Sequence, residues 1–190
     1  MRVEPRDVRL GDGRGCTVRS ARPRDAGRIL DHARDLTERE PEHHLPDPGE
    51  LELSVEGVER FCRAALASPS SLALVAVAGG EVVGFATLQG TARRKTRHVA
   101  ETGVGVRAGW RRAGLGRALL ETLLEAARGS PVLRKVSLRV FATNAAALSL
   151  YERLGFVLEG RRRAHVRVGD DFVDELLMGL FLRAEYPGAP

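Results

Sequence analysis

The sequence predicts one domain built on a mixed α/β sheet. The expected elements follow the order β-α-α-β-β-β-α-β-α-β-β, which favours a mixed sheet over a doubly wound parallel one. A length of 190 residues suits one domain with a full hydrophobic core. Hydrophobic residues make up 43% of the chain and charged residues 29%, as in ordinary globular proteins.

The two ends of the chain are predicted to lie outside the core. Residues 1–15 are charged and glycine-rich, so we expect a mobile leader. Residues 184–190 contain two prolines and a glycine and are expected to form a tail, which leaves 16–183 as the domain. No signal sequence is recognisable, and no apolar run approaches the roughly 18 residues of a membrane span. We therefore expect a cytoplasmic protein that does not bind membranes.

Two helices and three strands are predicted in the first half. A helix begins at Pro23, a residue suited to a first helical turn, and its apolar spacing continues to about Glu40. Ser54 can cap a second helix that runs through Ala67. Strands are expected at Cys16–Ala21, Leu72–Ala78 and Glu81–Gly90, the last two joined by a two-glycine turn.

The second half alternates strands with two further helices. The amphipathic segment Leu115–Arg128 predicts a helix that Gly129 and Pro131 end. Another helix covers Asn144–Leu154, with Gly155 as its C-terminal cap. Strands are expected at His98–Val106, Val136–Phe141, Phe156–Glu159 and Glu175–Leu182.

The net charge of +5 comes almost entirely from arginine, since only Lys95 and Lys135 are lysines. The run Arg161–Arg163 lacks the interleaved aromatic residues and the helix-turn-helix pattern of a nucleic-acid site. We expect a solvated strand end near Asp170, Asp171 and Asp174 and no nucleic-acid partner. The two cysteines form no CxxC motif and are expected to be inert thiols in a reducing compartment.

A glycine loop, residues 111–117, lies between a strand that ends in Val104-Gly105-Val106 and a helix. Backbone N–H groups at a helix N-terminus attract phosphate, and Gly114 and Gly116 allow a close approach. Three arginines add cationic donors. The residues alone leave open a plain turn with solvated arginines. The loop is neither a Walker A loop nor a GxGxxG fingerprint.

Two motifs resemble those of the GNAT acetyltransferases. Residues 111–116 fit the pattern R/Q-x-x-G-x-G/A, and residues 144–156 resemble the second block, N-x-x-A-x-x-L-Y-x-x-x-G-F. The resemblance spans Cys16–Leu182. It implies an acetyl-CoA-dependent N-acetyltransferase without a metal, on a mostly antiparallel sheet of six or seven strands with about four helices. It also implies that the central strands splay apart and that coenzyme A enters the wedge between them.

The resemblance also implies a cofactor site. The backbones of Val104 and Val106 would bind pantetheine, an N–H near Gly105 or Val106 would stabilise the oxyanion, and residues 111–117 would cradle the pyrophosphate. Asn144 would contact pantetheine or substrate, and it can also cap its helix. The implied cofactor residues are Val104, Gly105, Val106, Arg111, Arg112, Ala113, Gly114, Leu115, Gly116, Arg117 and Asn144.

Acetyl transfer needs an uncharged amine and a proton for the departing thiolate. The resemblance makes Tyr151 the proton donor; its alternative role is that of a core aromatic residue. Glu101 is the first candidate for the general base, because it lies on the strand that leads to Val104. The alternative is a surface charge paired with the arginines of 93–97. His98 is the second candidate for the base.

In the family's fold the segment Pro41–Leu53 often lines the acceptor pocket, so we expect His44, Glu50 and Glu52 to contact the amine. His43 and His44 lie beside Glu42 and Asp47, but adjacent histidines point apart, so no metal site is expected.

The C-terminal pattern from Gly160 to Met178 resembles the branch that acts on small molecules and amino acids. The favoured acceptor is therefore a small-molecule amine or amino acid. A protein N-terminus is the rival acceptor, and a non-catalytic acyl-CoA binder is the rival class. A homodimer is left open, because the apolar run Leu176–Leu182 suits either an interface or the core.

Overall fold

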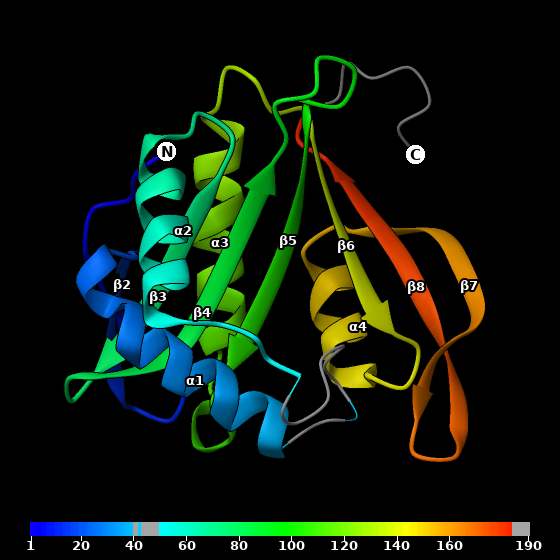
Figure 1. Cartoon of the computed structure of the whole chain (residues 1–190), viewed down its shortest axis with the longest axis horizontal. Coiled ribbons are helices and arrows are strands. Elements are labelled where there is room, and N and C mark those ends of the chain that lie inside the picture. Colours follow the sequence, from blue (N-terminus) through cyan, green and yellow to red (C-terminus); the bar gives the residue numbers. More distant parts are fainter. Residues whose placement is uncertain (40–41, 43–49, 184–190) are drawn as a thin grey trace.

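The computed structural model describes residues 1–39, 42 and 50–183. Eight strands form one sheet in the order β1-β2-β3-β4-β5-β6-β8-β7, and only β5 and β6 run parallel (Figure 1). The predicted mixed, mostly antiparallel sheet is confirmed, with one strand more than the expected maximum of seven. The strands are β1 (Arg6–Arg9), β2 (Gly15–Ser20), β3 (Leu72–Ala78), β4 (Glu81–Gly90), β5 (Val99–Val106), β6 (Lys135–Phe141), β7 (Val157–Val168) and β8 (Asp171–Phe181).

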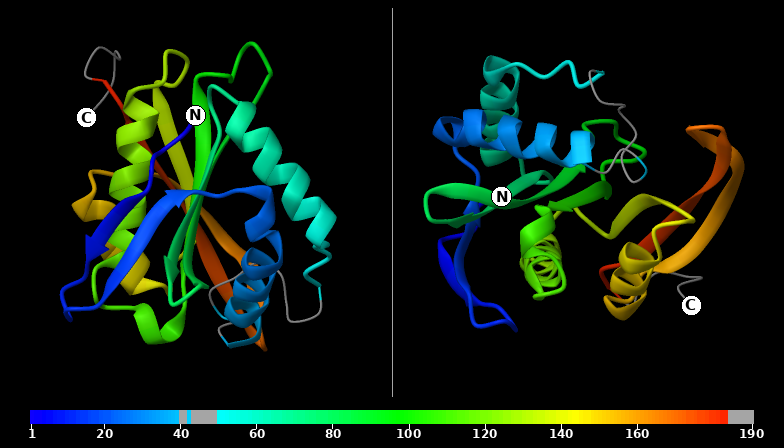
Figure 2. Two further views of the ribbon diagram at one scale, coloured as in Figure 1. Left: turned by 90° about the vertical axis from the view of Figure 1, so that its left-hand side faces the viewer. Right: turned by 90° about the horizontal axis from the view of Figure 1, so that it is seen from below.

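Helices cover both faces of the sheet. Figure 2 shows α1 (Ala26–Arg39) and α2 (Val55–Ala67) on one face and α3 (Leu115–Arg128) and α4 (Ala145–Arg153) on the other. The first predicted helix begins as a short 3₁₀ turn, Pro23–Asp25, before α1. The Ser54 hydroxyl accepts a hydrogen bond from Gly57 N–H, so the predicted cap of α2 is confirmed.

The extra strand lies in the segment that we expected to be a mobile leader, and that prediction is wrong. β1 pairs with β2 over four residues, and Val3 N–H donates to Ser20 Oγ at 2.8 Å. Arg6–Arg9 has a single apolar residue, so its alternation predicts no strand. Pairing with β2 stabilises this strand although its sequence does not alternate. The predicted tail, residues 184–190, lies outside the described residues.

The last two strands form a hairpin much longer than the sequence predicts. β7 was expected to end at Glu159 and β8 to begin at Glu175, yet the two pair up to a turn at Gly169, whose φ is +60°. Charged residues have low β-propensity, so the pattern did not reveal these strands. Cross-strand ion pairs hold the charged part together, among them Arg161–Asp174 and Arg162–Glu175.

The main core lies between the sheet and α3, where Leu119, Leu120 and Leu123 are fully buried. A smaller core lies between the sheet and the helices α1 and α2, and it includes Ile29 and Cys62. Every second residue of the apolar run in β8 contributes to the main core. One face of this run, which the sequence left open between interface and core, therefore serves the core.

Neither a membrane-spanning helix nor a metal-binding cluster is found in the described part of the chain. No helix there is both long and apolar enough to span a bilayer. Nor do three His, Cys, Asp or Glu side chains gather there into a potential metal site. His43, His44 and Asp47 lie outside the described residues.

Candidate active site

The two central strands separate soon after they meet. β5 and β6 pair only over Val99–Glu101 and Lys135–Ser137. From there β5 continues to Val106 paired with β4 alone, and β6 continues to Phe141 paired with β8 alone. Figure 1 shows the strands diverging downward, with α4 behind the opening. The expected splay of the central strands is confirmed, and we call the opening the wedge.

The edge of β5 that faces the wedge presents backbone groups. Arg107 N–H donates to Val83 O of the neighbouring strand β4 at 3.0 Å. Because alternate residues direct their backbone groups to opposite edges, Gly105 faces β4, whereas Val104 and Val106 face the wedge. An extended amide-bearing chain could bind this edge as an added strand does.

The glycine loop begins directly below this edge. Gly114, with φ +95°, is the N-cap of α3, and Arg112 also has a positive φ of 58°. The first helical bond runs from Ala118 N–H to Gly114 O, so the N–H groups of residues 115–117 lack helical partners. A Cβ on Gly116 would lie 3.5 Å from Leu150 Cδ2 and 3.6 Å from Val106 Cγ2. The loop, α4 and the end of β5 therefore meet at one point.

The side chains of the loop divide into anchors and exposed cations. Ala113 and Leu115 are buried, so only their backbones can contact a ligand. Arg111 Nε donates to Val106 O at 2.8 Å, and Arg117 Nε donates to Glu121 Oε1 at 2.8 Å. Within the described chain, no hydrogen bond or ion pair engages the Arg112 guanidinium. Unpartnered helix N–H groups beside arginines fit a pyrophosphate.

The turn between β1 and β2 supports the loop, which the sequence did not predict. Gly11 N–H donates to Ala113 O at 2.9 Å. The Arg14 guanidinium lies over the Trp110 ring and is held by Asp12 at 2.8 Å. The hairpin β1–β2 thus packs against the glycine loop and helps to position it.

Tyr151 lies on α4, one residue after Leu150 at the junction of loop and wedge. Its ring packs edge-on against Phe156, with centroids 5.8 Å apart. Burial raises the pKa of Tyr151 to about 12, so its hydroxyl stays protonated at neutral pH. The part of the chain that the structure describes offers this hydroxyl no hydrogen bond. The residue is a core aromatic that retains a transferable proton.

Asn144 caps α4, as the sequence allowed. Its Oδ1 accepts a hydrogen bond from Ala147 N–H at 3.1 Å. The cap occupies the oxygen of the amide, and its Nδ2 donor makes no bond with the described residues.

Glu101 lies where the central strands separate. Its Oε1 accepts two hydrogen bonds from Arg139 of β6, at 2.9 Å from Nε and 2.8 Å from Nη2. Oε2 makes no hydrogen bond with the described residues. The sequence suggested, as an alternative role, that Glu101 pairs with the arginines of 93–97. Glu101 is indeed paired, but its partner is Arg139. The next residue on the same face is Gly103, where an added Cβ would meet only Thr87 Oγ1, at 3.8 Å.

The other candidates for the acceptor side are only partly described. His44 lies outside the described residues, whereas Glu50 and Glu52 are exposed. His98 is half-buried directly before β5, and its carbonyl accepts the N–H of Arg134 at 2.8 Å.

Sequence reasoning missed two residues beside the wedge, Arg139 and His32. His32 of α1 is 1% exposed, and its Nε2 would lie 3.5 Å from a Cβ on Gly105. The sequence did contain a signal for Arg139: polar and apolar residues alternate in β6, which places Arg139 on the face away from the main core.

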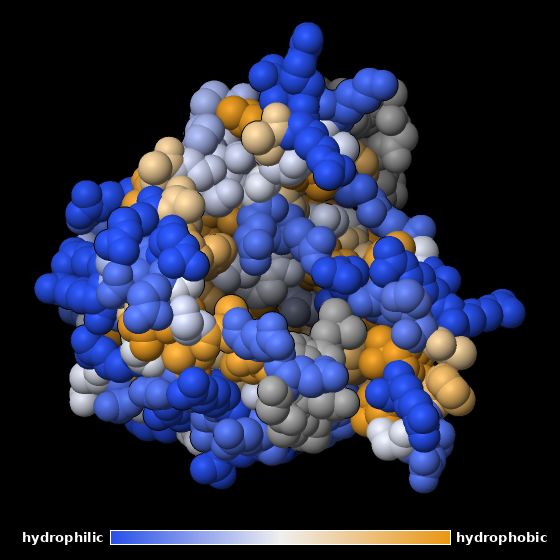
Figure 3. Space-filling view, viewed as in Figure 1, coloured by the Kyte–Doolittle hydropathy of each residue, from blue (hydrophilic) through white to orange (hydrophobic). Residues whose placement is uncertain are grey.

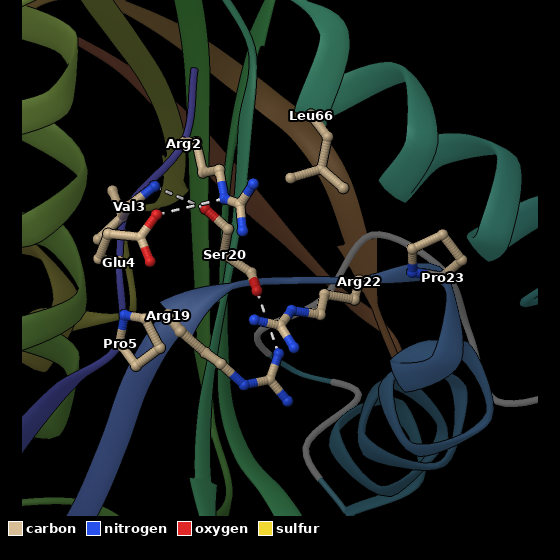
Figure 4. A pocket seen from close by; sticks show the side chains of 9 residues that line it. All are labelled: Arg2, Val3, Glu4, Pro5, Arg19, Ser20, Arg22, Pro23 and Leu66. Atoms are coloured by element: carbon tan, nitrogen blue, oxygen red, sulfur yellow. Dashed lines mark hydrogen bonds and ion pairs between the residues drawn. The ribbon is translucent and has the colours of Figure 1, made fainter.

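A separate cavity of about 310 Å³ lies near the N-terminal segment, away from the wedge (Figure 4). Arg2, Arg19 and Arg22 line it. The Arg19 guanidinium is already bound to the buried Asp25, at 2.6 Å and 2.8 Å. None of the residues that line the cavity belongs to the candidate site.

Comparisons with known proteins agree with this geometry. The Acetyltransferase (GNAT) family matches residues 30–156. An L-amino acid N-acetyltransferase of Escherichia coli, AaaT, is 31% identical over 110 residues, which cover 58% of this chain and 68% of that protein. The N-alpha-acetyltransferase RimI of Mycobacterium tuberculosis is 38% identical over 103 residues, which cover 54% of this chain and 63% of RimI.

Solved structures show the same fold. An acetyltransferase of the GNAT family from Streptococcus pneumoniae has a TM-score of 0.80 at 29% identity, covering 86% of this chain and 97% of its own. The yncA protein of Salmonella typhimurium, solved with its cofactor acetyl-CoA, has a TM-score of 0.78 at 22% identity, covering 92% of this chain and 97% of its own. The chain described here belongs to the GNAT family and is an N-acetyltransferase.

Proposed function

We propose that the protein transfers the acetyl group of acetyl-CoA to the primary amine of a free amino acid or another small molecule, directly within a ternary complex. The observation that carries the proposal is the wedge, because Glu101, the free edge of β5, Tyr151 and the glycine loop all border it. The E. coli relative named as an L-amino acid N-acetyltransferase supports the acceptor class.

The residues present fit the cofactor. Val104, and Val106 through the second lone pair of the carbonyl oxygen that also accepts from Arg111, would bind the amides of pantetheine along the free edge of β5. The N–H groups of residues 115–117 would bind the pyrophosphate, with Arg112 as an additional cation. The Asn144 Nδ2 donor would contact the pantetheine arm. Acetyl-CoA supplies an activated thioester carbonyl to this site.

Two side chains would move protons. Glu101 would accept a proton from the substrate ammonium at Oε2, directly or through one water molecule. Tyr151 would donate its hydroxyl proton to the departing sulfur. Of the two backbone donors considered for the oxyanion, Gly105 N–H is directed toward β4, so the role passes to Val106 N–H.

The M. tuberculosis relative, named as an N-alpha-acetyltransferase, favours a protein N-terminus as the second candidate acceptor. A non-catalytic acyl-CoA binder is the third. Thiol release from acetyl-CoA, measured across amino acids, polyamines and peptides, separates the three. We expect release with amino acids; release only with peptides would favour the second candidate, and binding without turnover would favour the third.

A further inference from the structure

Four charged side chains form a continuous row across the last four strands of the sheet. Arg139 of β6 binds Glu101 of β5 through Nε and Nη2, and its Nη1 lies 3.9 Å from Oε1 of Glu175 in β8. The other oxygen of Glu175 accepts a hydrogen bond from Arg162 Nη1 of β7 at 2.8 Å. We call these four residues the charge ladder.

The charge ladder lies on the face of the sheet opposite to α3. Val136, Leu138 and Val140 of β6 belong to the main core, so the alternate residue Arg139 points to the other face. The register pairs Glu101 with Ser137 and Phe141 with Glu175, which directs both glutamates to the same side as Arg139. Figure 3 shows this side of the molecule hollowed over β5 beside the wedge.

The middle of the ladder is buried, although its arginines are accessible. The Glu175 side chain is 1% exposed, whereas those of Arg139 and Arg162 are 42% and 44% exposed. A buried carboxylate is stable only with charged or hydrogen-bonded partners, so Glu175 holds both guanidinium groups in place. Their remaining N–H groups are presented to solvent in a fixed orientation.

The alternating charges match the head group of an amino acid. The open Oε2 of Glu101 attracts an ammonium, and Arg139 Nη1 is too far from Glu175 for a hydrogen bond and remains able to bind a carboxylate. Gly103 leaves space beside Glu101 toward the wedge. A peptide N-terminus has no carboxylate at this distance from its amine.

We propose that Arg139, held by its hydrogen bonds to Glu101 and its ion pair with Glu175, binds the α-carboxylate of the acceptor, with Arg162 as a second cation nearby. Arg139 would thus select free α-amino acids over peptides and simple amines. The inference rests on the proposed function. It assigns specificity to a strand residue that the sequence motifs do not contain.

The test compares each standard L-amino acid, as the free acid and as its methyl ester, in steady-state kinetics with acetyl-CoA. The quantity measured is the selectivity ratio, kcat/KM for the free acid divided by kcat/KM for the ester. We expect Arg139→Gln to lower this ratio about 10- to 100-fold, the range for a lost hydrogen bond to a charged group, and Arg139→Lys to recover part of it.

Arg161→Gln is the matched control, because Arg161 is the neighbour of Arg162, pairs with Asp174 and lies on the opposite face of β7. It should leave the ratio unchanged. An equal loss for acid and ester in Arg139→Gln would overturn the inference, because Arg139 would then act only through Glu101. Wild-type turnover of peptides as fast as free acids would also overturn it and leave the proposed function intact. Turnover of no amine would instead contradict the proposed function.

Discussion

The guanidinium of Arg14 lies over the indole ring of Trp110, with its Cζ 4.3 Å from the ring centroid. One residue belongs to the turn between β1 and β2, and the other directly precedes the glycine loop. Together with the Gly11–Ala113 hydrogen bond, this contact joins the N-terminal hairpin to the proposed pyrophosphate site.

Arg14→Gln should therefore weaken cofactor binding. Loss of a cation–π contact of about 0.5–1 kcal/mol loosens the loop, so we expect a rise of about two- to fivefold in KM for acetyl-CoA. Trp110 is the only tryptophan, so its fluorescence should change in the same variant. The exposed Arg9 of β1 provides the control: Arg9→Gln should alter neither quantity. Unchanged fluorescence and KM in Arg14→Gln would show that the hairpin does not position the loop.

Tyr151→Phe should lower kcat by about 10²- to 10⁴-fold, the usual contribution of a general acid. The ring remains in the core, so the melting temperature should change little. Because burial raises the pKa of Tyr151 to about 12, wild-type activity should show no basic limb from this residue between pH 6 and pH 10. Retention of full activity by the variant would return Tyr151 to a purely structural role.

Asp25 should make folding sensitive to acid. Burial alone would raise the pKa of its carboxyl group, but hydrogen bonds from Arg19 and from Arg22 N–H hold it below the ordinary value. A lowered folded-state pKa stabilises the fold above the unfolded value of about 3.9, and this contribution is lost as the pH falls through the folded-state pKa.

Asp25→Asn leaves Arg19 without its buried partner and should cost about 3–5 kcal/mol at pH 7. Urea unfolding at several pH values measures both effects. The difference in unfolding free energy between wild type and variant should shrink below about pH 4; a difference independent of pH would contradict the role assigned to the carboxylate.

Gly103→Val should separate activity from stability. The position is an exposed strand site where an added Cβ meets only one side-chain atom, and valine favours strands. We expect an unchanged or higher melting temperature together with a KM for the acceptor raised about tenfold or more, since the side chain fills the space beside Glu101. An unchanged KM would place the acceptor elsewhere.

The elements with strong periodicity could be predicted from the sequence. The predicted bounds of β3, β4 and α3 agree with the structure, because their apolar residues repeat at strand or helix spacing between clear turn signals. β1 and most of β7 could not be predicted, because their many charged residues do not show the apolar alternation of a half-buried strand.

Some residues of the candidate site could be predicted from the sequence, and others could not. The glycine loop and the segment from Asn144 to Tyr151 are local motifs, and a single sequence reveals them. Arg139 belongs to no local motif, and its importance depends on the pairing of β5 with β6, two strands far apart in the sequence whose contact a single sequence does not reveal. The partner of Glu101 was therefore assigned to the wrong arginines.

The most direct test of the central claim is the melting temperature of the protein at increasing concentrations of acetyl-CoA. A ligand that binds only the folded protein stabilises it by about 2.7 kcal/mol at 100 times its dissociation constant. We predict a saturable rise in melting temperature, which Gly114→Val should abolish because valine does not tolerate the φ of +95° at the start of α3. A wild-type melting temperature that stays constant up to millimolar acetyl-CoA would contradict the proposal that the wedge and the glycine loop form a cofactor site.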